Sequence, residues 1–236
     1  MSLKEDILKK AQEIESEDFI VDDVSSVPTI SNSKLTFGCK GLEFDATVLY
    51  IDMRGSTSIL NNHRKRVVAK IHMLYYHAIV RIAQEEEGEI RSFNGDSLLV
   101  FFPGKSSENI SNAVRAAMKM VYAINNLLND NLKRYSDIDF GIGIDFGKIL
   151  ATKVGIGGNN ETKDLIWIGN PVNKSTKISD NCHNPYNIGI SDTVYKKLED
   201  YVKYNNRNAN IWKKESFKYN NQSEFYYSTN YYCIIN

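Results

Sequence analysis

The chain of 236 residues has no excess of charge of either sign, because 29 lysines and arginines balance 29 aspartates and glutamates. This balance gives no electrostatic argument for binding DNA, RNA or an anionic membrane surface. No apolar run approaches the roughly 20 residues that a membrane-spanning helix needs, and the first residues lack the apolar core of a secretory signal. We therefore expect a cytoplasmic protein with no nucleic-acid or membrane partner.

Cysteine is also scarce. The three cysteines, Cys39, Cys182 and Cys233, are odd in number and scattered, which argues against a disulfide framework and a cysteine metal site. Hydrophobic residues make up 42% of the chain and charged residues 25%, the ordinary composition of a soluble globular protein. The length suits one large domain, or one domain with an arm.

Two apolar stretches each carry an aspartate at one end, and they hold most of the functional information. The first runs from Val48 to Asp52 and continues into the turn Met53–Thr57, and the second, Ile90–Val100, contains Asp96. An unpaired charge in a buried strand costs several kcal/mol, so a carboxylate there usually has a cation. Two such carboxylates predict a divalent-metal site, and therefore an enzyme that acts on a phosphate ester.

Each aspartate alone also has a structural explanation. An aspartate that ends a strand is often the N-cap of the next helix, and Asp96 suits a hairpin turn. However, Tyr50 and Asp52 share one sheet face, and Gly55-Ser56-Thr57 opens the next helix, whose N-terminus suits a triphosphate. Together with a third motif, described below, these neighbours favour catalysis, provided that the fold brings the two aspartates together.

The hydrophobic pattern divides the chain into an N-terminal arm, 1–41, and a domain, 42–236. The arm has an amphipathic helix over Leu3–Glu17 and a polar linker at 22–28, and it either packs on a partner chain or is a disordered tail. The domain follows the order β-α-β-β-α-β, which predicts an antiparallel sheet with packed helices, a ferredoxin-like α+β layer. Expected strands are 46–51, 89–94, 97–102, 138–144, 165–168 and one near 187; expected helices are 62–87, 108–129, 171–179 and 191–199, with a loop at 155–160 and a final hairpin.

The third motif, Asp139–Lys148, continues through Ala151–Gly155 to Ile168–Asn173. With the two aspartate motifs, it resembles the class III nucleotidyl cyclases, the adenylate and guanylate cyclase family. The matching segments follow the family's order from about Phe44 to Ser179. The resemblance implies a ferredoxin-like βαββαβ catalytic domain with extra C-terminal strands, acting on a nucleoside triphosphate.

The family's roles transfer to the matching positions of this chain. Its two metal-binding aspartates correspond to Asp52 and Asp96, which would hold two divalent ions, Mn²⁺ or Mg²⁺, with the backbone of Ile51. Asn173 corresponds to the asparagine that orients the ribose. Where the family has an arginine for the α-phosphate, this chain has Lys177, which keeps the charge but loses the bidentate fork. The turn expected to line the metals and phosphates consists of Met53, Arg54, Gly55, Ser56 and Thr57.

In this family, one subunit supplies the aspartates and its neighbour supplies the asparagine and the cation. Since this chain carries both sets, the resemblance implies a head-to-tail homodimer with two shared active sites and an inactive monomer. The family often has a lysine on the C-terminal hairpin for the terminal phosphates. Lys213, Lys214 and Lys218 are equal candidates for that role.

The positions that read the base differ from those of known purine cyclases. Adenylate cyclases have a lysine where this chain has Ser92, and an aspartate or threonine where it has Ile166, while guanylate cyclases have a glutamate and a cysteine there. Ser92, Asn94 and Tyr50 instead offer short polar groups and a phenol near the aspartates. A site that hydrogen-bonds one base rejects a base that leaves its polar groups unpaired, so we expect a different substrate.

These features are similar to the pyrimidine cyclases of bacterial Pycsar anti-phage systems, whose cyclic UMP or cyclic CMP activates a separate effector. We expect UTP (or CTP) to yield a cyclic nucleotide and pyrophosphate, with uracil and cytosine both open. The alternatives are a class III adenylate cyclase and a degenerate domain that only binds nucleotide. Diguanylate cyclases and polymerase palms also use two carboxylates on such a sheet, but the hairpin lacks the Gly-Gly-acid-Glu-Phe turn of diguanylate cyclases.

Overall fold

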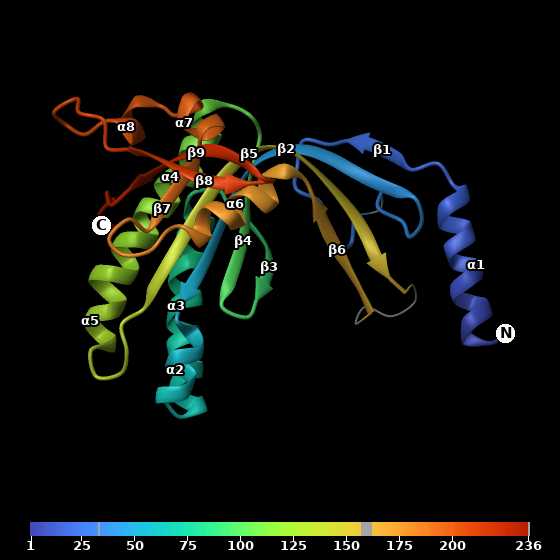
Figure 1. Ribbon diagram of the computed structural model, residues 1–236, viewed down its shortest axis with the longest axis horizontal. Helices are drawn as coiled ribbons and strands as arrows, with labels where there is room; N and C mark the ends of the chain where they lie inside the picture. Colours follow the sequence, from blue (N-terminus) through green and yellow to red (C-terminus); the bar gives the residue numbers. More distant parts are fainter. Residues whose placement is uncertain (33, 157–161, 236) are drawn as a thin grey trace.

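The computed structural model describes residues 1–32, 34–156 and 162–235, so most of the loop expected at 155–160 lies outside the described residues. Within them, nine strands form one sheet in the order β3-β4-β2-β5-β7-β9-β8, with β1 beside β2 and β6 beside β5 (Figure 1). The strands are β1 (Ile20–Asp23), β2 (Lys40–Arg54), β3 (Glu89–Asn94), β4 (Ser97–Pro103), β5 (Asp139–Gly155), β6 (Lys163–Ile168), β7 (Ile188–Ser191), β8 (Lys213–Tyr219) and β9 (Gln222–Thr229). The helices are α1 (Leu3–Ser16), α2 (Ser56–Asn62), α3 (Lys65–Glu85), α4 (Ser107–Tyr122), the π-helix η1 (Ala123–Leu128), α5 (Asn129–Leu132), α6 (Asn170–Asp180), α7 (Asp192–Lys197) and α8 (Asp200–Lys203).

Helices α3 and α4 cover one face of the sheet, and their apolar stripes form the main core there. Leu49 and Ile51 of β2 belong to this core, whereas α6 packs against β5 and β2. Gly143 of β5 permits this close packing, since a Cβ there would lie 1.9 Å from a carbonyl oxygen of α6. Because successive side chains of a strand alternate between faces, Tyr50 and Asp52 point to the α6 side.

The predicted order of the central elements is confirmed. β2 pairs with β4 and β5 in antiparallel register, and the hairpin of β3 and β4 turns at Gly95, whose φ of 65° suits glycine. Two other pairs, β1 with β2 and β5 with β7, run parallel instead of antiparallel. The chain passes from β5 through β6 and α6 before β7, and such a crossover brings β7 back in the same direction as β5.

Two predicted helices are interrupted. The helix expected over 62–87 begins only at Lys65, because His63 and Arg64 have extended backbone between α2 and α3. The helix expected over 108–129 is α-helical only to Tyr122, and Ala123–Leu128 form a π-helix. A π-helix has i→i+5 hydrogen bonds in place of i→i+4, but six residues are too few to change the apolar pattern of the sequence visibly.

The N-terminal segment joins the sheet earlier than the sequence suggests. α1 begins at a capping box of Ser2 and Glu5, buries none of its residues and stands apart from the sheet (Figure 1). The linker expected at 22–28 starts as a strand instead, since β1 pairs with the first residues of β2, and Val27 is only 4% exposed. The division at residue 41 into arm and domain stays a proposal. In the described part of the chain, no helix combines the length and apolarity needed to cross a membrane.

Candidate active site

The fold brings Asp52 and Asp96 together at one end of the central strands. Asp52 lies near the end of β2 opposite Ser97 of β4, and Asp96 occupies the turn just before that serine. The Met53 N–H donates to the Asp96 carbonyl oxygen at 3.4 Å, and the two carboxyl groups lie within hydrogen-bonding reach of each other. The backbone pairing of two neighbouring strands therefore fixes this pair of acids.

The electrostatic setting of the two acids fits a divalent cation. Burial raises the pKa of the Asp52 carboxyl, the Asp96 carboxylate raises it further, and the Arg54 guanidinium opposes both effects. Two negative groups held this close favour a shared positive ion. No third acid, histidine or cysteine joins them among residues 1–32, 34–156 and 162–235. Mg²⁺ commonly uses only one or two carboxylates together with substrate phosphates, so this donor set fits the expected metal.

Arg54 links the acid pair to α6. Its guanidinium donates to Asp52 Oδ2 at 2.9 Å, to the Ser179 carbonyl oxygen and to the Cys182 carbonyl oxygen at 3.4 Å. Ser179 lies in the last turn of α6 and Cys182 just beyond its C-cap, where unpaired carbonyl groups carry partial negative charge. The sequence assigned Arg54 to the phosphate-lining turn, whereas the structure shows its side chain bonded to a proposed metal ligand.

Two tyrosines surround the acids and keep their protons. Burial raises the pKa of Tyr50, whose phenol lies within hydrogen-bonding reach of Ser97. Burial and the two acids together raise the pKa of Tyr76 to about 12. The Tyr76 hydroxyl donates to the Gly95 and Ser97 carbonyl oxygens at 2.9 and 3.1 Å. Tyr76 thus braces the turn that carries Asp96. Sequence reasoning missed it because it stands beside the core residue Tyr75 on α3.

The turn after β2 contains a left-handed glycine and borders a hollow. Gly55 adopts φ 68° in the left-handed region and starts α2. Ser56 and Thr57 line a hollow of about 360 Å³ together with Asp96. Ile51 and Met53 are buried in the core on the α3 and α4 side, so only their backbone groups are available to a ligand.

A second group of predicted residues gathers around α6. Asn173 and Lys177 line a separate hollow of about 580 Å³, and Lys218 of β8 lines it too. Of the three candidate lysines, the other two have local partners: Lys213 pairs with Glu215 at 2.6 Å, and Lys214 lies 3.9 Å from the centre of the Phe225 ring. Lys218 is thus the one of these three lysines that lines the hollow with Asn173 and Lys177.

Lys177 has a partner that the sequence analysis overlooked. Its ammonium lies 3.1 Å from Asp180 Oδ2, and both side chains are largely exposed. Residues three apart on a helix are neighbours, so the spacing alone could have revealed this pair. The negative charge of Asp180 also makes a small contribution to the raised pKa of both Tyr50 and Asp52.

Side chains beneath α6 tie it to the C-terminal hairpin. Lys174, next to Asn173, forms a 2.6 Å ion pair with Glu224 of β9 and is only 14% exposed. Its ammonium also lies 5.0 Å from the centre of the Tyr219 ring, and the Tyr219 hydroxyl donates to Asn170 Oδ1 at 2.5 Å. These contacts set the position of the helix that presents Asn173 and Lys177.

The proposed base-reading residues are only partly brought together. Tyr50 is paired with Leu99, which is paired with Ser92, so these three form one row across β2, β4 and β3. Asn94 and Asp52 are both paired with Ser97, two residues further along, so Ser97 of β4 lies between them. Ile166 lies elsewhere, on β6 opposite Thr152 and 42% exposed. Within one chain, the structure thus places Ile166 on a different strand pair from the other three.

The fold, with two acids at one end of its central strands and helix α6, which carries an amide and a lysine, on the same face of the sheet, is that of the class III nucleotidyl cyclases. The chain matches the family model of the adenylate and guanylate cyclase catalytic domain over residues 43–227 and belongs to that family. It is therefore an enzyme of the nucleotidyl cyclase type, a phosphorus–oxygen lyase.

Individual relatives agree with this assignment. The chain is 28% identical over 233 residues to a uridylate cyclase of Xanthomonas perforans, covering 97% of each sequence. It is 30% identical over 220 residues to a uridylate cyclase of Burkholderia cepacia, covering 91% of this chain and 92% of the relative. Among solved structures, the guanylyl cyclase Cya2 is similar with a TM-score of 0.68 at 19% identity, covering 81% of this chain and 94% of that chain, which shows the fold alone.

Proposed function

We propose that the protein is a pyrimidine nucleotide cyclase, which converts UTP, or CTP, to the 3′,5′-cyclic monophosphate and pyrophosphate. The observation that carries the proposal is the convergence of Asp52 and Asp96 beside Tyr50, Ser92 and Asn94, with no lysine at the adenine-reading position. The names of the two relatives support uracil as the base, since both are uridylate cyclases.

The reaction forms a bond between the 3′ oxygen and the α-phosphorus and breaks the bond from that phosphorus to the pyrophosphate oxygen. Asp52 and Asp96, with the backbone of Ile51, are the groups that would hold two divalent ions, Mn²⁺ or Mg²⁺. When bound, such ions neutralise phosphate charge and ease the loss of a hydroxyl proton. The turn Met53–Thr57 would bind the phosphates with its backbone N–H groups, next to the hollow that Asp96 lines.

The residues around α6 would act on the same nucleotide from a second subunit. Asn173 would orient the ribose, Lys177 would neutralise the α-phosphate, and Lys218 would bind the terminal phosphates, since all three line one hollow. To bind the phosphate, the Lys177 ammonium would have to give up its ion pair with Asp180. That exchange costs little, because exposed ion pairs contribute at most about 1 kcal/mol. We therefore propose a head-to-tail homodimer with two shared sites.

Specificity would come from the row of residues beside Asp52. The Tyr50 phenol keeps its proton, and Ser92 and Asn94 add short polar groups that can hydrogen-bond a single-ring base. Ile166 would present an apolar surface where purine cyclases have a polar group. We extend the proposal to the cytoplasm and to anti-phage defence, in which the cyclic pyrimidine nucleotide would act on a separate effector protein.

The direct test is to incubate the purified protein with an equal mixture of the four nucleoside triphosphates and Mn²⁺ or Mg²⁺, and to identify the products by mass spectrometry. We expect cyclic UMP or cyclic CMP together with pyrophosphate, and no product from the Asp52→Ala variant. Cyclic AMP or cyclic GMP as the main product would contradict the pyrimidine assignment. Nucleotide binding without any pyrophosphate release would identify a degenerate domain instead.

A further inference from the structure

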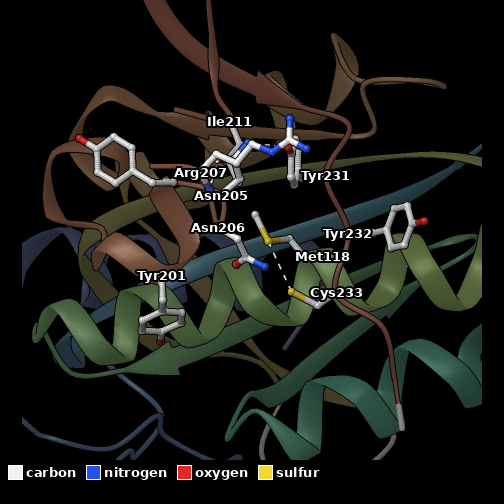
Figure 2. A pocket seen from close by; sticks show the side chains of 10 residues that line it. Met118, Tyr201, Asn205, Asn206, Arg207, Ile211, Tyr231, Tyr232 and Cys233 are labelled. Carbon is white, nitrogen blue, oxygen red and sulfur yellow. Dashed lines mark hydrogen bonds between the residues drawn. The ribbon is translucent and has the colours of Figure 1, made fainter. Parts of the chain in front are cut away.

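A hollow of about 480 Å³ lies away from the proposed catalytic residues, between the loop after α8 and the C-terminal segment (Figure 2). We call it the tyrosine pocket, because Tyr201, Tyr204, Tyr231 and Tyr232 line it around Arg207, with Met118 of α4 at its base. α4 lies on the face of the sheet opposite α6. None of the residues assigned above to metal, phosphate, ribose or base lines this pocket.

The walls of the tyrosine pocket are held in place by hydrogen bonds within the protein. Asn205 Oδ1 accepts the backbone N–H groups of Arg207 and Ala209 at 3.0 Å each, and Asn205 Nδ2 donates to the Tyr231 hydroxyl at 3.0 Å. On the other wall, the Cys233 N–H donates to the Met118 carbonyl oxygen at 3.3 Å. The loop and the C-terminal segment are therefore fixed to each other before any ligand enters.

Two polar side chains of this loop have no partner of their own. Among the described residues, neither the Arg207 guanidinium nor the Asn206 amide has a hydrogen-bond or ion-pair partner, whereas Arg115 binds Glu86 at 2.6 Å and Arg54 binds Asp52 at 2.9 Å. Figure 2 shows Arg207 extending toward Tyr231 and the Asn206 amide lying near Met118 and Cys233. One free guanidinium and one free amide are thus presented at a single hollow.

The aromatic side chains add exposed ring surface at the same place. Tyr201, Tyr231 and Tyr232 are 51%, 40% and 49% exposed, and all three line the pocket. The Tyr201 ring lies 5.6 Å from the Arg115 guanidinium and the Tyr232 ring stacks on Tyr122 at 5.7 Å, so one face of each is already in contact. The Tyr231 ring lies beside Arg207 in Figure 2, and its hydroxyl is bonded to Asn205, so its ring face is what it offers to a ligand. Flat rings prefer such faces in stacked or edge-on arrangements.

We propose that the tyrosine pocket binds a nucleoside monophosphate. The Tyr231 ring would contact the base, the Asn206 amide would pair with a base edge that has one donor and one acceptor, and the Arg207 guanidinium would bind the phosphate. The hollow falls within the volume range of small-molecule sites. A nucleoside without phosphate would leave the Arg207 guanidinium without a partner, and a phosphate without base would leave the tyrosine ring and the Asn206 amide without one.

The test is calorimetric titration of the full-length protein with UMP, CMP, AMP and GMP in EDTA, which removes the metal that the proposed catalytic site requires. We expect one site per chain for at least one of the four. Its affinity should fall at least tenfold in Arg207→Gln and in Asn206→Ala, equivalent to about 1.4 kcal/mol. The nucleoside of whichever monophosphate binds, and inorganic phosphate alone, titrated separately, should each bind at least tenfold more weakly.

Control variants separate this site from the catalytic one. Asp52→Asn and the exposed Arg81→Gln of α3 should bind the same nucleotide as tightly as the unaltered protein. Both pocket substitutions change exposed residues, and thermal unfolding will check that each variant is folded. The proposal is overturned if no monophosphate binds below about 1 mM, if Arg207→Gln and Asn206→Ala leave binding unchanged, or if Asp52→Asn abolishes it.

Discussion

The two halves of the proposed active site are held in place by different means. In the carboxylate half, backbone pairing of β2 with β4 and a short turn fix Asp52 and Asp96. In the helix half, Asn173 and Lys177 depend on how α6 sits, and partly buried side chains such as Lys174 and Glu224 determine that. Single substitutions outside the reacting groups should therefore disturb the helix half more than the carboxylate half.

The largest effect should follow from removing the acids themselves. In Asp52→Ala and Asp96→Ala, the shared pair of carboxylates is gone, so no divalent ion is held where charge must be neutralised. We expect no measurable cyclic product from either variant, while circular dichroism and thermal unfolding show a folded protein. If either variant keeps more than about a tenth of the normal turnover, corresponding to less than 1.4 kcal/mol of barrier, the carboxylate half is not where metal chemistry occurs.

A mixed dimer tests whether the two halves come from different chains. Asp52→Ala and Asn173→Ala should each be inactive alone. An equal mixture that exchanges subunits should regain about a quarter of normal activity, because half of the dimers are mixed and each of these has one intact site of two. Activity is measured after unfolding and refolding the two variants together. Complete inactivity of the mixture would contradict the shared site.

The next effect concerns the anchoring of α6. Glu224→Gln removes the partner of Lys174, and a small displacement of Asn173 should lower kcat about tenfold or more, because misplacing a reacting group by 1 Å can cost roughly 100-fold. Lys174→Arg keeps the charge and should retain most of the activity. As a matched control, Glu86→Gln breaks another partly buried pair, with Lys119, and should lower stability without lowering kcat. Equal loss of kcat in both glutamine variants would show a general effect on folding.

A smaller effect is expected in the carboxylate half from Arg54→Gln. Arg54 lowers the pKa of the Asp52 carboxyl, so its removal lets that pKa rise, and protonation then competes with metal binding at higher pH. The acid limb of the pH–rate profile should move to higher pH, and turnover at neutral pH should fall by less than about tenfold, since one such pair contributes on the order of 1 kcal/mol. A shift of the acid limb to lower pH would contradict this account.

The sequence predicted the carboxylate half better than the helix half for a physical reason. The apolar runs next to Asp52 and Asp96 indicate directly which strands are buried and where they end. The turn at Gly95 sets how β3 pairs with β4, and so where Asp96 lies. By contrast, the link between Lys174 and Glu224 joins residues far apart in the sequence, and no local pattern indicates it. The sequence analysis missed strand β1 for a similar reason, because a strand of four residues is too short to show a hydrophobic period.

The smallest effect should come from Asp145, a buried acid of β5 near the Lys174 pair. Burial raises the pKa of its carboxyl, while a hydrogen bond with Ser191 and the Lys174 charge oppose the shift only in part. A raised pKa in the folded state means that stability present below the ordinary pKa of 3.8 is lost as pH rises through the folded-state value. Asp145→Asn avoids this loss, so its free energy of unfolding in urea should exceed that of the unaltered protein at neutral pH and match it below pH 3.8, with kcat changed less than twofold. A less stable variant at neutral pH would show that attraction to Lys174 outweighs the cost of burial, and the anchoring of α6 would then extend to this acid.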